Sequence, residues 1–336
     1  MSYGTRIPNL TLRGELDSAI DFNRTGYSEL QIQIAKGTKY IQRSDNPVAT
    51  DEAGVIKTEN VQSEQWRTNI QRAEGWEKTT DASMQQVLSV MQRVNELTVQ
   101  ANNDINATDR STIAKEVNQI IDSLVSVGNS QYLGVGIFSG MVTGTDAFTK
   151  TVDADGNITA VTYNGGTTQR NIQTSESSST VYGLIGEGIA GSNTGVFRNT
   201  SFENIATAGN PDDYQNVDTR LFAELINFRD WLNGGTITDP TGGNPNYDKT
   251  TNMNRLQNCL EQVISKVVEN STSQQKLKRL ETSVDSGITA ATNRLSDVED
   301  LDMARAATRL NEMQVTLEAS LQIAAQIGKI SILNYI

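Results

Sequence analysis

The fold is decided by a heptad pattern that runs through MNRLQNCLEQVISKVVENSTSQQKLKRLETSVDSGITAATNRLSDV, residues 253–298. One register steps by seven from Leu256, and a second steps by seven from Leu260. Sustained over about six heptads, this spacing predicts a single helix of roughly 60 Å with a coiled-coil seam. The two registers are Leu256, Val263, Asn270, Leu277, Val284, Ala291 and Val298, and Leu260, Val267, Gln274, Glu281, Ile288 and Leu295.

Polar residues occupy three positions of this seam. Asn270, Gln274 and Glu281 either fix the register of the seam or mark a stretch that stays in contact with water, and both interpretations stay open. Cys259 lies in the same pattern. Because the chain has no histidine to act as its base, we predict a packed or half-exposed structural thiol rather than a nucleophile.

Both ends of the chain carry similar apolar stripes. Neither stripe lies on a helix long enough to bury it alone, so each helix needs a partner. We therefore predict that the terminal helices pack against each other and against neighbouring copies of the chain. The predicted assembly residues are Leu12, Leu16, Leu30, Ile34, Met303, Ala306, Leu310, Met313, Leu317, Leu321, Ala324 and Ile327.

Two further helices are predicted between the N-terminal stripe and residue 128. The first begins at Asn46 and Pro47, because asparagine caps a helix and proline fits its first position. The second carries an apolar face from Ile113 to Val127 and ends at Gly128, which gives a helical hairpin. The seam of the first comprises Ile70, Met84, Met91 and Thr98 in one register and Ala73, Val87, Val94 and Ala101 in the other.

Residues 141–205 have a different chemistry, dominated by glycine, threonine, serine and asparagine. Short β-like runs between turn signals predict a small β-rich insert. Residues 153–157 are faintly similar to half of a calcium loop, but the downstream acidic ligand is missing, so a hairpin turn is favoured. Because glycine-rich turns flank the insert, we expect assembly to survive its removal. Residues 218–233 return to a helical pattern.

The composition excludes several classes of function. The chain has 336 residues, no histidine and a net charge of −12. Without the commonest general base and metal ligand, we predict no enzyme, no cofactor and no metal site. The negative charge argues against nucleic acid or an anionic membrane as a partner. No apolar stretch matches a membrane span or a signal peptide, so we expect any export to proceed without cleavage.

Several segments carry a likeness to a known family. They are the turn Ser44-Asp45-Asn46-Pro47, Ile137-Phe138-Ser139-Gly140, Leu221–Leu232, Asp300–Leu310 and the tail Ser331–Ile336. Together they resemble the bacterial flagellin family, and the helix at 221–232 and the Tyr-Ile ending are most similar to its hook–filament junction branch. Asn46 departs from the second aspartate usual in the family turn, but both residues cap helices.

The resemblance implies a mainly α fold: a long coiled-coil-like helical bundle built from both chain ends, with a small β-rich inserted domain that projects outward. Ser44, Asp45, Asn46 and Pro47 would form the interdomain turn. The implied domains are 1–42 with 299–336 as an inner coiled coil, 43–140 with 206–298 as a helical bundle, and 141–205 as the outer insert.

The implied function is that of a structural subunit at the hook–filament junction, exported unfolded to the extracellular flagellum. The implied partners are neighbouring copies in a ring or tube, a second hook-associated junction protein, flagellin and an export chaperone. A self-polymerising filament flagellin is the alternative within the family. A secreted surface adhesin that uses the 141–205 insert is a less favoured alternative from another class.

Overall fold

The computed structural model of the chain describes residues 9–103, 107–188, 195–204, 214–240 and 247–333. It confirms a mainly α fold with a small β-containing region. Its helices are α1 (Asn9–Lys36), α2 (Pro47–Asn102), α3 (Ala107–Gly128), α4 (Leu221–Leu232), α5 (Lys249–Glu299) and α6 (Met303–Leu333). Among the described residues, none of the helices combines the length and the apolar character needed to cross a membrane.

The strands form four antiparallel pairs within the described residues. The first two pairs join β1 (Gln131–Tyr132) to β2 (Val135–Gly136) and β3 (Phe148–Val152) to β4 (Ile158–Tyr163). The other two join β5 (Arg170–Gln173) to β6 (Ser179–Tyr182) and β7 (Arg198–Asn204) to β8 (Tyr214–Arg220). The β region therefore extends past the predicted end of the insert, as far as Arg220.

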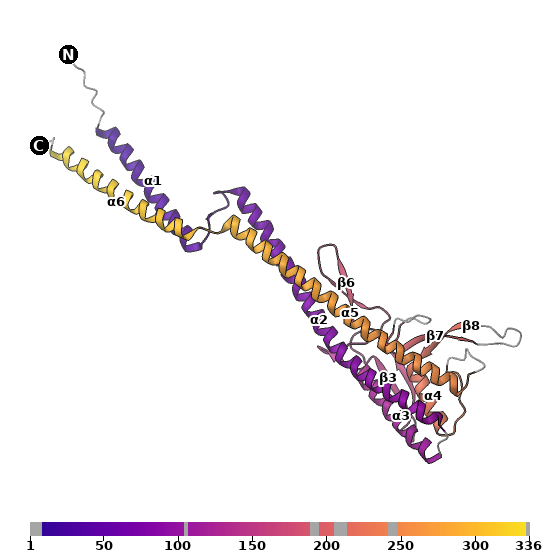
Figure 1. Cartoon of the computed structure of the whole chain (residues 1–336). Helices are drawn as coiled ribbons and strands as arrows, with labels where there is room; N and C mark the ends of the chain where they lie inside the picture. The colour runs from indigo at the N-terminus through magenta and orange to yellow at the C-terminus, as the bar shows by residue number, and fades with distance from the viewer. Residues whose placement is uncertain (1–8, 104–106, 189–194, 205–213, 241–246, 334–336) are drawn as a thin grey trace. The chain divides into compact units, whose positions relative to one another are not determined.

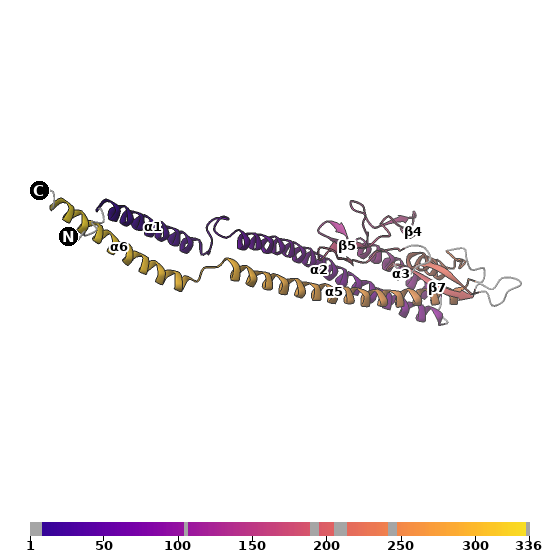
Figure 2. The same ribbon diagram turned by 90° about the horizontal axis from the view of Figure 1, so that it is seen from above.

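The chain forms two compact units. The first unit takes Met1–Glu64 and Ser286–Ile336, and the second unit takes Gln65–Asp285. In the first unit, α1 and α6 lie side by side, as two perpendicular views show (Figure 1, Figure 2). The three-part division expected from the sequence stays a prediction.

The second unit contains the main hydrophobic core. All eight predicted seam residues of α2, from Ile70 to Ala101, are buried, and so are Leu256, Val263 and Leu277 of α5. Helices α3 and α4 add a further layer, since Ile121, Leu124, Leu225 and Phe228 join the same core. The heptad pattern thus identified a real buried seam.

Three polar seam residues of α5 make hydrogen bonds to α2. The Asn270 and Gln274 side-chain amides each donate to the Glu77 carbonyl oxygen at 3.3 Å, and the Gln71 amide donates to Glu281 Oε1 at 3.1 Å. Of the two interpretations left open, register fixing by cross-helix bonds therefore agrees with the structure. Cys259 is buried in the core, as predicted, and burial raises the pKa of its thiol.

The β insert shares this core instead of standing apart from it. Phe148 and Phe197 pack edge to face with ring centroids 5.2 Å apart, and Phe148 also lies 5.2 Å from Phe222 of α4. Ile158 and Leu184 are buried in the same cluster. Removal of the insert would therefore open the core of the second unit. The expectation that assembly survives this removal stays a prediction.

The turn between β3 and β4 is a hairpin turn. Asp153 Oδ1 accepts hydrogen bonds from the N–H groups of Asp155 and Asn157 at 3.0 and 2.8 Å, and Gly156 adopts a φ of 84°. These backbone bonds hold the pKa of Asp153 below its ordinary value. The carboxylate thus organises the turn, which is the interpretation that the sequence favoured.

Candidate assembly surface

The terminal helices α1 and α6 form a pair that brings most of the predicted assembly residues together. Leu30 of α1 and Ala306 of α6 are buried. A Cβ atom at Gly26 would lie only 2.7 Å from Cε of Met313, so this glycine allows a close approach of the two helices. Half-buried positions complete the contact side: Leu16, Ile34, Leu310, Met313, Leu317 and Ala324.

Two predicted assembly residues are not covered by the partner helix. Met303 and Leu321 each keep half of their surface exposed. Leu12 and Ile327 lie within α1 and α6, but their side chains are outside the described part of the structure, as is the tail at 334–336. The contact between α1 and α6 therefore buries only one side of the predicted apolar stripe.

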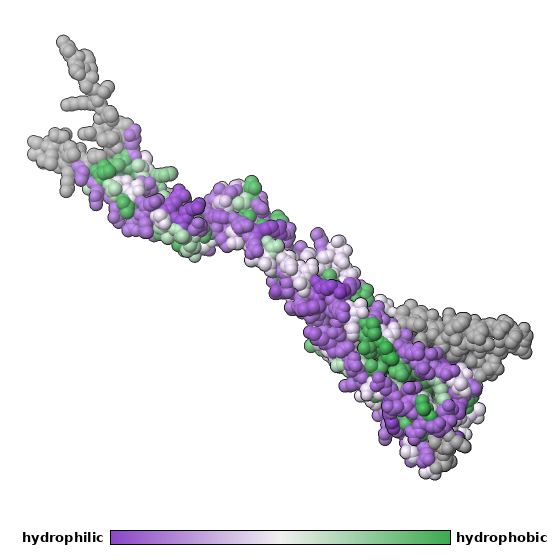
Figure 3. Space-filling model, in the orientation of Figure 1, coloured by the Kyte–Doolittle hydropathy of each residue, from purple (hydrophilic) through white to green (hydrophobic). Residues whose placement is uncertain are grey.

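The structure also shows exposed apolar residues that the heptad analysis missed. Phe22 of α1 is 78% exposed and Val315 of α6 is 65% exposed. Phe22 and Val315 fall outside the heptad registers. An apolar residue outside the stripe was the sign in the sequence that these side chains could lie on the surface. Figure 3 shows the resulting apolar surface, in green, on this helix pair.

This exposed surface has a clear energetic consequence. Moving one such side chain from water into an apolar contact contributes about 1.5–3 kcal/mol. A helix pair that leaves several of them in water gains stability from another copy or another protein, and a patch of this kind commonly marks an interaction site. The α1–α6 pair is therefore the candidate assembly surface.

A short connection holds the terminal helices to the rest of the first unit. The Leu301 N–H donates to the Gly37 carbonyl oxygen at 2.9 Å, and the Lys39 N–H donates to the Glu299 carbonyl oxygen at 2.8 Å. Gly37 adopts a φ of 72°, a conformation that favours glycine. The ends of α1 and α5 are thereby fixed to each other by backbone bonds.

The predicted turn at Ser44–Pro47 starts α2 in the expected way. Asn46 Oδ1 accepts the Ala49 N–H at 3.1 Å, which confirms the cap, and Pro47 is the first helical residue. Asp45 Oδ2 accepts the N–H groups of Ile41 and Gln42 at 2.8 and 2.9 Å. These bonds hold the pKa of Asp45 below its ordinary value. The role of this segment as an interdomain turn stays a prediction.

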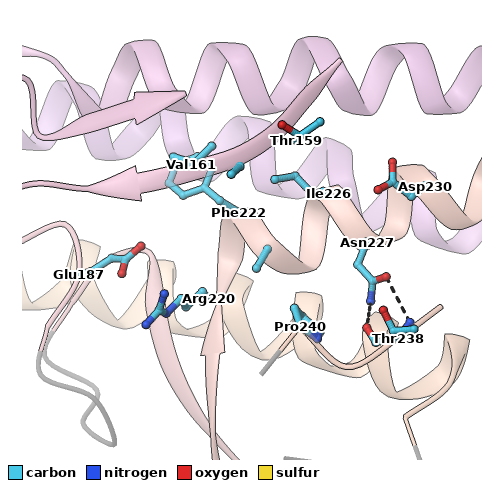
Figure 4. Close-up of a pocket in the computed structure, with 12 residues that line it drawn as sticks. Thr159, Val161, Glu187, Arg220, Phe222, Ile226, Asn227, Asp230, Thr238 and Pro240 are labelled. Atoms are coloured by element: carbon cyan, nitrogen blue, oxygen red, sulfur yellow. Dashed lines mark hydrogen bonds between the residues drawn. The ribbon is translucent and has the colours of Figure 1, made fainter. Parts of the chain in front are cut away.

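The second unit contains a cavity of ≈ 290 Å³ between β4, α4 and the segment at Thr238–Pro240 (Figure 4). Asn227 bonds to both backbone groups of Thr238, since its amide donates to the carbonyl oxygen at 2.6 Å and its Oδ1 accepts the N–H at 3.4 Å. Asp230 pairs with Arg229 at 2.6 Å. Asn227 and Asp230 are thus engaged with neighbouring groups of the chain, and Glu187 and Arg220 also line the cavity.

Comparison with known proteins agrees with the geometry of the two chain ends. Residues 8–143 match the bacterial flagellin N-terminal helical region, and residues 271–336 match the bacterial flagellin C-terminal helical region. Together these ranges cover more than half of the chain. They include α1 and α6, the helices that form the candidate assembly surface.

Individual relatives point the same way. The chain is 24% identical to flagellar hook-associated protein 3 of Escherichia coli (strain K12) over 317 residues, 92% of this chain and 91% of that protein. It is 28% identical to flagellin FlaB1 of Treponema pallidum (strain Nichols) over 124 residues, which span 34% of this chain but only 43% of that flagellin.

A solved structure shares the fold. It is a putative flagellar hook-associated protein from Vibrio parahaemolyticus, with a TM-score of 0.55 at 16% sequence identity. The alignment covers 76% of this chain and all of that one.

Proposed function

Because the chain belongs to the bacterial flagellin family, we propose that it is a structural subunit of the flagellum that joins the hook to the filament. The role is mechanical and not enzymatic. It requires only surfaces that bind neighbouring subunits, and the α1–α6 pair offers such a surface.

One observation carries the proposal: apolar side chains stay in water on both paired terminal helices. Phe22 on α1 and Val315 on α6 are mostly exposed although each helix already has a partner. In an assembled ring or tube, these side chains would be buried between copies. The assembly residues predicted from the heptads, Leu310 and Leu317 among them, would hold each pair together beneath this contact.

The choice of the junction within the family rests on the length of the match to hook-associated protein 3. That match spans nine-tenths of both chains, whereas the match to the Treponema flagellin spans about a third of this chain. A filament flagellin is the second candidate, and the Treponema match favours it. A filament subunit stacks on itself without limit, whereas a junction subunit binds different proteins above and below.

The proposed partners follow from this position. They are neighbouring copies of the chain, a second hook-associated junction protein on one side and flagellin on the other. We further propose that an export chaperone binds the C-terminal region before assembly, since the exposed apolar residues of α6 need cover in the free subunit. The assembled protein belongs to the extracellular flagellum.

Electron microscopy of the purified chain, with and without isolated hooks, tests the proposal. We expect the chain to bind hook ends and to form no long filaments alone. A strain that lacks the chain should produce hooks without filaments and release flagellin into the medium. Long filaments of this chain alone would overturn the junction role and support the flagellin alternative.

A further inference from the structure

The buried carboxyl group of Glu77 connects three elements of the second unit. Glu77 lies on α2 and is only 1% exposed. Its Oε1 accepts the Gly183 N–H at 2.9 Å, directly after β6, and the Ser273 hydroxyl of α5 at 2.7 Å. One oxygen atom thus fastens the end of the β5–β6 hairpin to both helices of the seam.

The other carboxyl oxygen has no donor. Glu77 Oε2 is buried without a hydrogen-bond partner, and so is Oδ1 of Asn270. The amide of Asn270 donates to the backbone carbonyl oxygen of Glu77 at 3.3 Å, so α5 packs against α2 at this turn. A buried carboxylate oxygen without a donor is costly because its charge is poorly compensated. A proton on Oε2 removes that charge.

We propose that Glu77 is a neutral carboxylic acid in the folded protein and acts as an alkaline-sensitive latch, holding the β5–β6 hairpin on the α2–α5 seam until it loses its proton. In the neutral form, the proton lies on Oε2, and Oε1 keeps its bonds from Gly183 and Ser273. Loss of the proton leaves a charged carboxylate in a buried position, which favours opening of the hairpin.

The charges around Glu77 agree with this direction. Burial is the main cause that raises the pKa of Glu77, and the negative charge of Glu269 on α5 raises it further. The bonds from Gly183 and Ser273 act in the opposite sense and are outweighed. Lys276 of α5 lines a surface pocket that also reaches Glu77, but its side chain is exposed, so water screens its charge.

The remaining charged and titratable neighbours lie on α2 and on the hairpin. On α2, Lys78 is exposed and lies 3.9 Å from Glu74. On the hairpin, Arg170 stacks 4.5 Å above the Trp76 ring, and Tyr182 packs edge to face on that ring at 6.1 Å. Burial raises the pKa of Tyr182, while the positive charges of Arg170 and of Arg72 on α2 act in the opposite sense. None of these residues forms an ion pair with Glu77 among the described contacts.

The hairpin that Glu77 holds also covers Trp76. A Cβ atom at Gly183 would lie 3.0 Å from Nε1 of Trp76, so the chain after β6 lies directly on the indole. Opening of the latch would therefore bring Trp76 into contact with water. Trp76 fluorescence and hydrogen exchange at the Gly183 amide both report on this event.

The sign of the pH effect follows from the raised pKa. The folded state binds the Glu77 proton more tightly than the unfolded chain. The stability that this contributes is complete below the ordinary glutamate pKa and is lost as pH rises through the folded-state pKa. The loss corresponds to about a tenfold fall in the folding equilibrium constant for each pKa unit by which the group is raised.

The test compares the full-length chain with Glu77→Gln, which mimics the neutral acid. We expect the urea midpoint of the unmodified chain to fall between pH 5 and pH 8, and the midpoint of E77Q to fall less and to exceed it at pH 8. Glu281→Gln is the matched control on the same seam. Bonds from Lys278 and Gln71 lower the pKa of Glu281, so E281Q should lose stability most at high pH. Glu224, whose pKa burial also raises, is common to all variants and cancels.

A second measurement needs no variant. Protection of the Gly183 amide in the unmodified chain should decrease from pH 6 to pH 8, after correction for the intrinsic exchange rate, together with a red shift of tryptophan emission. Constant Gly183 protection over this range would overturn the latch. A midpoint of E77Q that lies below that of the unmodified chain by the same amount at every pH would also overturn it.

Discussion

In the second unit, heptad residues such as Met91 of α2 and Val263 of α5 are closed off from solvent, whereas in the first unit Met303 of α6 keeps half of its surface in water and Leu310 and Leu317 are only half-buried. The spacing is the same in both regions. What differs is the number of elements available to cover the stripe. The seam of α2 and α5 lies under α3, α4 and the β hairpins, while α1 and α6 have only each other within the described first unit.

This difference separates two roles of one sequence pattern. A seam covered from several sides contributes to the stability of the single chain. A stripe covered from one side contributes little until another subunit arrives. Heptad spacing alone therefore does not show whether a stripe stabilises the single chain or binds another subunit. Matched substitutions in the two regions should distinguish these two roles.

The largest expected effect follows deletion of residues 143–200. We expect the second unit to lose cooperative unfolding, because Phe148 and Phe197 leave the core, and removal of one buried phenylalanine side chain alone costs about 3–5 kcal/mol. Circular dichroism during urea titration measures this. Replacement of the exposed Thr149 by alanine is the control. If the urea unfolding curve is unchanged after the deletion, the insert is a separate outer module and not part of the core.

The next effect is expected from Val263→Asp on α5. An unpaired charge in the sealed seam should lower the free energy of unfolding by about 3–5 kcal/mol. The matched control is Val268→Asp on the same helix, where the side chain is 60% exposed and the cost should stay within about 0.5 kcal/mol. Equal losses for the two variants would show that burial does not distinguish these positions.

The same substitution in the first unit should separate assembly from stability. Val315→Asp is expected to change the free energy of unfolding by less than about 0.5 kcal/mol, because the side chain is exposed in the single chain. Binding to hooks, followed by electron microscopy and motility, should be strongly reduced. Asn311→Asp adds the same charge at another exposed α6 position and should bind normally if Val315 belongs to the contact.

The smallest effect is expected at the start of α2. Asn46→Ala removes the acceptor of the Ala49 N–H and should cost about 1 kcal/mol. Hydrogen exchange at the Ala49 amide should increase, while the second unit keeps its stability. Asn46→Asp keeps the acceptor and should be nearly neutral. If N46A also destabilised the second unit, the two units would unfold together.

Much of the helical architecture was predictable because local rules fix it. The cap at Asn46 and the proline at the first turn act through their own backbone geometry. The eight seam residues of α2 were identified from spacing alone, and all are buried. Part of the candidate site was predictable for the same reason, since Leu30 and Ala306 lie on their stripes.

The rest depends on contacts between segments far apart in the sequence. No local rule shows that Phe148 and Phe197 join the helical core, or that Phe22 and Val315 stay exposed beside a partner helix. The buried environment of Glu77 also depends on distant residues, because its carboxyl group accepts hydrogen bonds from residues 106 and 196 positions away in the sequence.

The sequence by itself determined the start of α2 and which side of each long helix is apolar, because helix caps and heptads act over a few residues. It did not determine the start of α4, since residues 218–220 of the predicted helix belong to β8. Only the tertiary structure decided which apolar sides are buried within the chain and which stay available to other subunits. Burial is a property of all neighbours together, and most of those neighbours are distant along the chain.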